Sequence, residues 1–252
     1  LSHERHGLDA AGQGRVLIEE LRCAGCHSGP VKRKLGPDLS GVGARVEAGY
    51  LKRFLLDPHK ADPGTQMPDI LGMLPEDEQD ATAEVLTYYL KSLSKEKFSR
   101  AKVDAALVGE GKKLFEKVGC ITCHAPGSGV GLKHVPAKYG LDSLSAFLFQ
   151  PRHARSSGRM PDMNLTRDEA RSIAAYLLGL KELKVTELKP DLAKVQAGKL
   201  VFRRLNCTSC HNLPNQKSQL KLPMAELTVG KGCLAETPDG VPNFNLSAAQ
   251  RE

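Results

Sequence analysis

Apolar residues recur in the same register in three segments of the chain, each directly before a cysteine. The segments read GRVLIEELRC, GKKLFEKVGC and GKLVFRRLNC, and each begins with a glycine nine residues before its cysteine. Apolar side chains five and two residues before the cysteine share one face of a helix, because an α-helix repeats every 3.6 residues. Three such segments in register indicate one module repeated three times. The glycines are Gly14, Gly111 and Gly198, and the apolar positions are Ile18, Leu21, Phe115, Val118, Phe202 and Leu205.

The first two repeats match again further along the chain. YLKRFLLDP and SLSAFLFQP each predict a middle helix that ends at a proline, and a Met-Pro-Asp sequence begins nine residues after each proline, at Met67 and Met160. A closing helix follows in both repeats. In the first, acidic residues occupy the first turn after Pro75, and in the second a capping box begins at Thr166.

The third repeat departs from this pattern. Its last segment, GVPNFNLSAAQRE, aligns with GRMPDMNLTRDEA of the second repeat but has Val241 where the second has Met160. It predicts no middle helix, and LSAAQRE has the features of the N-cap and first turn of a closing helix. We therefore expect the third module to be divergent or incomplete. We also expect the natural chain to continue beyond Glu252, or an additional domain or subunit to complete the module.

The cysteines indicate the chemistry. Six of the seven lie in three copies of C-x-x-C-H, which is the attachment signature of c-type haem. Two thiols three positions apart reach the two vinyl groups on one edge of a haem, and the next residue places an imidazole under the iron. A zinc site would need paired C-x-x-C units in one small domain, and a redox dithiol would need a βαβ context. The motifs are Cys23, Cys26 and His27; Cys120, Cys123 and His124; and Cys207, Cys210 and His211.

The order of these features resembles the class I cytochrome c family: a helix, C-x-x-C-H, the loop GPDL at 36–39, a middle helix, a Met-Pro loop and a closing helix. The resemblance covers the first two modules, although the second lacks the GPDL loop. It implies an all-α fold of three tandem helical domains, at 1–98, 99–184 and 185–252, each wrapped around a covalent haem. Three haems would supply apolar core to a chain with 5% aromatic residues and no Trp.

The resemblance also implies the axial ligands of the iron. The histidines of the motifs, His27, His124 and His211, would be the proximal ligands. Met67 and Met160 would be the distal ligands of haems 1 and 2, and Met73 and Met163, which lack the shared spacing, would pack beside them. Ligation by His and Met raises the reduction potential relative to two histidines, which suits electron transfer.

The distal ligand of haem 3 stays open, because Val241 cannot bind iron. Met224 in KLPMAEL is one candidate, and Cys233, the unpaired cysteine, is another. The alternative for Cys233 is a small buried thiol. The site could also be open or water-bound, or its ligand could come from beyond Glu252 or from a partner chain. For His59 and His153 we expect contact with solvent or with haem propionates, and His134 could do this or bind iron.

Composition limits the function further. The 252 residues carry a formal net charge of +7, but no dense Lys/Arg block indicates nucleic-acid binding and no apolar run is long enough to span a membrane. Attachment of c-type haem implies a periplasmic or otherwise exported bacterial protein. We expect a triheme carrier of single electrons between redox protein partners and not a stand-alone enzyme. The alternatives are a haem enzyme, in which haem 3 acts on peroxide or on a small sulfur or nitrogen compound, and an electron inlet within a larger protein.

Overall fold

The computed structural model describes residues 7–30, 36–100, 102–125, 131–155, 158, 160–179, 184–213, 216, 218 and 222–251. These residues form helices and no β-strand, so the predicted all-α fold is confirmed for the part of the chain that is described. Among these residues, one isolated antiparallel β-bridge joins Asp69 and Asn243. None of the described helices is long and apolar enough to cross a membrane.

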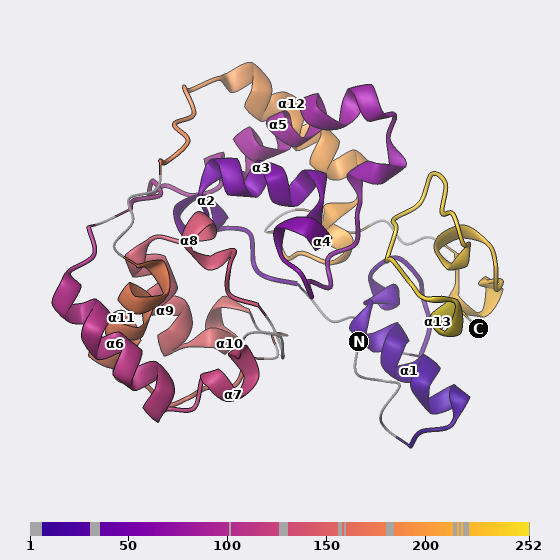
Figure 1. Ribbon diagram of the computed structural model, residues 1–252. Coiled ribbons are helices and arrows are strands. Elements are labelled where there is room, and N and C mark those ends of the chain that lie inside the picture. The colour runs from indigo at the N-terminus through magenta and orange to yellow at the C-terminus, as the bar shows by residue number, and fades with distance from the viewer. Residues whose placement is uncertain are drawn as a thin grey trace.

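Figure 1 shows the helices in three groups. The helices of four or more residues are α1 (Ala10–Glu20), α2 (Val42–Arg45), α3 (Ala48–Leu56), α4 (Pro58–Ala61), α5 (Glu76–Ser92), α6 (Ala105–Lys117), α7 (Ile121–His124), α8 (Val135–Lys138), α9 (Leu141–Phe149), α10 (Pro151–Ala154), α11 (Arg167–Leu178), α12 (Leu192–Arg204) and α13 (Ala248–Arg251). The short 3-10 helices are η2 (Cys23–Gly25), η3 (Leu71–Met73), η4 (Cys207–Ser209), η5 (Met224–Glu226) and η6 (Gly232–Leu234).

The three helices that lead into the cysteine motifs are built alike at both ends. Each of α1, α6 and α12 follows an aspartate whose carboxylate accepts a hydrogen bond from a backbone N–H of the first turn, which fixes the helix start. Each is followed by a residue in the left-handed region directly before the first cysteine, which ends the helix and turns the chain. The caps are Asp9, Asp104 and Asp191, and the left-handed residues are Arg22 (φ 61°), Gly119 (φ 88°) and Asn206 (φ 54°).

Helices α6–α11 form what we call the second-repeat bundle. Its first helix, α6, crosses the closing helix α11 at Gly111, where a Cβ atom would lie 1.9 Å from the Ser172 carbonyl oxygen. One turn further, the rings of Phe115 and Tyr176 lie 5.5 Å apart. The capping box predicted at Thr166 is confirmed at the start of α11. One repeat therefore folds as a contiguous unit around a close helix crossing.

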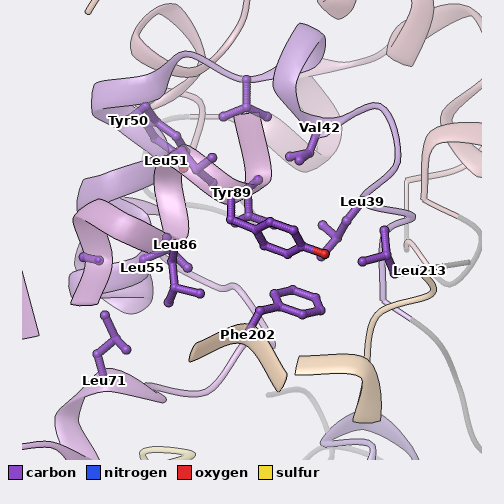
Figure 2. Close-up of a cluster of buried hydrophobic side chains, with 13 residues drawn as sticks. Leu39, Val42, Tyr50, Leu51, Leu55, Leu71, Leu86, Tyr89, Phe202 and Leu213 are labelled. Carbon is purple, nitrogen blue, oxygen red and sulfur yellow. The ribbon is translucent and has the colours of Figure 1, made fainter. Parts of the chain in front are cut away.

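The same crossing occurs a second time, between helices of different repeats. Helix α12 packs along α5, and a Cβ atom at Gly198 would lie 2.0 Å from the Val85 carbonyl oxygen. The rings of Tyr89 and Phe202 lie 5.3 Å apart, and Figure 2 shows them facing each other in the core. We call α2–α5 together with α12 the composite bundle, because it joins the body of the first repeat to the first helix of the third.

The first helix of the chain lies elsewhere. In Figure 1, α1 lies beside the C-terminal segment and α13, and we call α1, the first cysteine motif and residues 222–251 the terminal lobe. Its motif is tied to the C-terminal segment by the Met224 N–H, which donates to the Ser28 carbonyl oxygen at 2.8 Å. Contacts therefore cross the boundaries that chain order predicts at residues 98 and 184. Those boundaries remain a prediction.

A buried ion pair joins the composite bundle to the second-repeat bundle. Asp62, which follows α4, lies 2.9 Å from the Lys138 ammonium of α8 and 3.5 Å from the His134 ring. Both partners of the closer pair are nearly inaccessible to solvent, and the Glu47 N–H also donates to the Lys138 carbonyl oxygen at 2.9 Å. Because a buried charge without a partner is costly, this pair fixes how the two bundles meet.

We predict that Asp62→Ala lowers the free energy of unfolding at pH 7 by about 3 kcal/mol, because it leaves the Lys138 ammonium buried without its partner. Urea titration followed by circular dichroism measures this loss. Asp80→Ala, which breaks the exposed pair between Lys52 and Asp80, is the control and should cost less than about 1 kcal/mol. Equal effects of the two substitutions would contradict the prediction.

The difference in free energy of unfolding between Asp62→Ala and the unmodified chain should be smaller in acid than at pH 7. Burial raises the pKa of Asp62, but Lys138 and His134 outweigh this and hold that pKa below its ordinary value. A carboxyl with a lowered folded-state pKa stabilises the fold above its unfolded pKa of about 3.9, and this is lost as the pH falls through the folded-state pKa. Urea titrations at pH 7 and pH 3 test the direction, and a gap that widens at pH 3 would contradict it.

Candidate haem sites

The three cysteine motifs adopt the same turn. In each, the N–H of the histidine donates to the carbonyl oxygen of the first cysteine, at 2.9 Å in the first motif, 3.1 Å in the second and 3.0 Å in the third. Residues three and four apart in such a turn lie on one face. Both thiols and the imidazole of each motif therefore share a face, as the attachment of one planar macrocycle requires.

Two of the histidine rings are oriented by backbone carbonyls. His211 Nδ1 lies 2.9 Å from the Pro37 carbonyl oxygen, and His27 Nδ1 lies 2.7 Å from that of Leu222. A carbonyl oxygen can only accept, so Nδ1 of each ring carries a proton, and in a neutral imidazole this leaves the lone pair on Nε2. A bond of this kind fixes the tautomer and orientation of a metal-ligating histidine. Both rings therefore have the hydrogen bond that orients metal-ligating histidines in other proteins.

Burial shifts the pKa values of His211 and of two motif cysteines. Burial lowers the pKa of His211, and the nearby Arg22 lowers it as well. The Pro37 carbonyl raises this pKa, but the net value lies below the ordinary one. The imidazole is then neutral at pH 7, which is the form that binds a metal. Burial raises the pKa of Cys23 to about 11 and that of Cys207 to about 12. Such thiols are protonated at neutral pH, unlike the activated thiols of redox or nucleophilic sites.

The two predicted methionine ligands lie in the two helical cores. Met160 packs on the core of the second-repeat bundle, which Cys120 of the second motif also contacts, and Met163 packs there too. Met67 packs on the core of the composite bundle, which Cys207 of the third motif contacts. Met160 thus packs on the same core as Cys120 of its own repeat. Met67 packs on the same core as Cys207 of the third repeat, whereas chain order predicts the first motif for it, because α12 packs on α5.

Both candidates for the altered distal side lie beside the first motif. The Met224 side chain packs against Gly29, two residues after His27. Met224 also lies two residues after Leu222, whose carbonyl oxygen accepts from the His27 ring, and so it lies on the proximal side of that motif. Burial raises the pKa of Cys233, and Cys26 raises it further, so these two thiols lie close together. These contacts are with the first motif, whereas chain order predicts both residues for His211 of the third.

The loop that carries Val241 has the backbone of the loop that carries Met160. In both, an asparagine in the left-handed region donates its N–H to the side chain two residues earlier, and the next residue is a buried leucine. The third repeat therefore keeps the form of the methionine loop without the methionine sulfur. The corresponding residues are Asp162, Asn164 and Leu165 in the second repeat, and Asn243, Asn245 and Leu246 in the third.

Two further histidines lie near these cores. His59 of α4 has its Nε2 atom buried, with no hydrogen-bond partner among the described residues. A buried polar atom without a partner calls for a missing group, and a haem propionate carboxylate would satisfy this ring nitrogen. His134 instead faces Asp62 between the two bundles. The oriented imidazoles, the paired thiols and the orphaned ring nitrogen fit covalently bound haem.

Comparison with known proteins identifies one part of the chain. Residues 108–181, which run from within α6 past the end of α11, match the family model for cytochrome c. Cytochrome c oxidase subunit 2 of Alkalihalophilus pseudofirmus is 37% identical over 92 residues, and that of Bacillus sp. (strain PS3) is 36% identical over 100 residues. These matches cover 33% and 34% of the chain, and 25% and 27% of those proteins. The chain thus spans about a quarter of the length of these relatives. No solved structure matches.

The match and the helical structure together support a class I c-type cytochrome domain at residues 108–181. A domain of this family binds haem covalently and serves haem-based electron transfer.

Proposed function

We propose that the chain is an exported multihaem cytochrome, which attaches three haems at its three C-x-x-C-H motifs and passes single electrons between redox protein partners. The observation that carries the proposal is the pair of histidine-to-carbonyl hydrogen bonds, from His27 to Leu222 and from His211 to Pro37. They support haem binding at the two motifs outside residues 108–181, which the family model does not cover. The similar proteins are named as subunits of cytochrome c oxidase, and this is compatible with a redox protein partner for this chain.

Each part of the chain has a distinct role in this proposal. The haem, when bound, supplies the one-electron chemistry. The paired thiols hold it by one edge, the oriented imidazole provides the proximal nitrogen, and the apolar cores keep water from its faces. The methionines Met67 and Met160 provide thioether sulfur, a soft and weakly basic ligand that favours the reduced state. The side chains therefore set the potential and the access, which are the properties that an electron carrier needs.

Haem content tests the number of sites. After coexpression with a c-type haem maturation system, we expect a haem-to-protein ratio of three, from pyridine haemochrome absorbance and intact mass. Cys120→Ala/Cys123→Ala should lower the ratio to two, because the second motif then has no thiol. Cys233→Ala, which lies outside the motifs, should leave it at three. A ratio of one in the unmodified chain would reject the triheme proposal and leave a cytochrome of the second repeat alone.

Met160→Ala tests the distal ligand of the second site. We expect it to remove part of the weak far-red band that marks methionine bound to ferric iron, and to lower the reduction potential of one haem. Met163→Ala is the matched control, because Met163 packs on the same core and lies three residues away. Loss of the band in Met163→Ala but not in Met160→Ala would reverse the assignment.

A second candidate function, a haem enzyme, is favoured by one observation. The loop with Val241 keeps the backbone of a methionine loop but has no side chain there that binds iron, so one haem would have an open or thiolate-ligated face. Binding of carbon monoxide to one haem of the reduced protein would support this reading. Three low-spin haems without carbon monoxide binding would leave the electron carrier as the function.

A further inference from the structure

The structure shows which closing helix two of the three motif-leading helices, α6 and α12, pack on. Helix α6 packs on α11 of its own repeat, but α12 of the third repeat packs on α5 of the first. A Cβ atom would meet a backbone oxygen at 1.9 Å in the first crossing and at 2.0 Å in the second, so both glycines are pressed against a closing helix. The equivalent residue of α1, Gly14, has no described neighbour within 4 Å of its Cβ position.

The proximal loops follow the same rule. The GPDL loop lies in the first repeat, yet its Pro37 carbonyl orients His211 of the third motif. The corresponding carbonyl for His27 comes from Leu222, in the third repeat. Near the first motif the Ser218 hydroxyl donates to the Gly25 carbonyl oxygen at 3.0 Å, which adds a further link to the third repeat. Each of these two motifs therefore takes its surroundings from the other repeat.

Corresponding residues of the two repeats also meet each other directly. Gly25, in the first motif, packs so closely on Ser209 of the third that a Cβ atom would lie 2.6 Å from the Ser209 carbonyl oxygen. Asp69 and Asn243, each two residues after the methionine position, exchange backbone hydrogen bonds at 2.9 and 3.0 Å. Contacts between equivalent positions are what a two-fold relation produces. The first and third repeats are thus arranged as a pseudo-symmetric pair.

We propose that the first and third repeats exchange their haem-bearing helices, so that the haem held by Cys207 and Cys210 takes Met67 as its distal ligand. The haem held by Cys23 and Cys26 then faces the loop of Val241, with Cys233 nearby. This inference rests on the proposed function, and it assigns the distal ligand of one site and the distal surroundings of another. The haem without a methionine becomes the first in the chain, and its attachment motif lies directly against the motif of a methionine-ligated haem. That contact would place the two attachment motifs side by side, as electron exchange between their haems requires.

The first test reads which motif Met67 serves, in the full chain loaded with haem. In Cys207→Ala/Cys210→Ala we expect the far-red band to fall to the part due to Met160, and adding Met67→Ala should cause no further loss. In Cys23→Ala/Cys26→Ala the band should keep its full intensity per molecule, and adding Met67→Ala should remove about half of it. The reverse pattern would overturn the exchange. Haem content measured on the same samples keeps this outcome separate from failure of the proposed function, which would show as missing haem in the unmodified chain.

The second test does not depend on removing a haem. Gly198→Ala should lower the Tm by roughly 5 °C or more, because the new methyl group meets the Val85 carbonyl oxygen. Gly111→Ala, at the crossing within the second repeat, is the positive control and should behave alike. Gly14→Ala should leave the Tm unchanged or raise it, because its site is open and alanine favours a helix. A large loss at Gly14 with none at Gly198 would place α1 on α5 and overturn the proposal.

Discussion

The close crossing of two helices is the constraint on which this molecule depends. A helix that begins with an aspartate cap reaches its closing helix at a glycine, and no other residue fits, since a Cβ atom would lie about 2 Å from a backbone oxygen at Gly111 and Gly198. An aromatic pair one turn later, such as Tyr89 and Phe202, fills the space beyond the crossing (Figure 2). The crossing sets the position of the helix end, and the helix end sets the position of the thiols and imidazole.

From this crossing the haem-binding chemistry follows by short steps. A left-handed residue ends each helix directly before the first cysteine, and one helical turn then puts both thiols and the histidine on a common face. A carbonyl from a separate loop orients the imidazoles of His27 and His211, and burial keeps His211 neutral. These outer-shell bonds are of the kind by which proteins orient the histidines of a metal site.

Directional polar contacts join the bundles. The buried pair of Asp62 and Lys138 lies between the composite and second-repeat bundles, and the backbone bridge of Asp69 and Asn243 ties the composite bundle to the terminal lobe. Such contacts are directional, so they define one arrangement where a smooth apolar surface would allow several. A fixed arrangement matters for a protein proposed to pass electrons between haems, because transfer depends on how closely the haems are held.

The sequence by itself determined the local structure and the residue types at the candidate sites. The helical period before each cysteine, the C-x-x-C-H spacing, the capping box at Thr166 and the loss of methionine at Val241 are all short-range patterns, and short-range patterns act the same way in every fold. Only the tertiary structure decided which repeat completes which site. Three helices with the same glycine and the same apolar face can each fit any of the closing helices, so no local pattern tells α1 from α12 as the partner of α5. That choice depends on contacts between residues far apart in the chain, such as His211 with Pro37 and Gly25 with Ser209, and a linear pattern does not contain them.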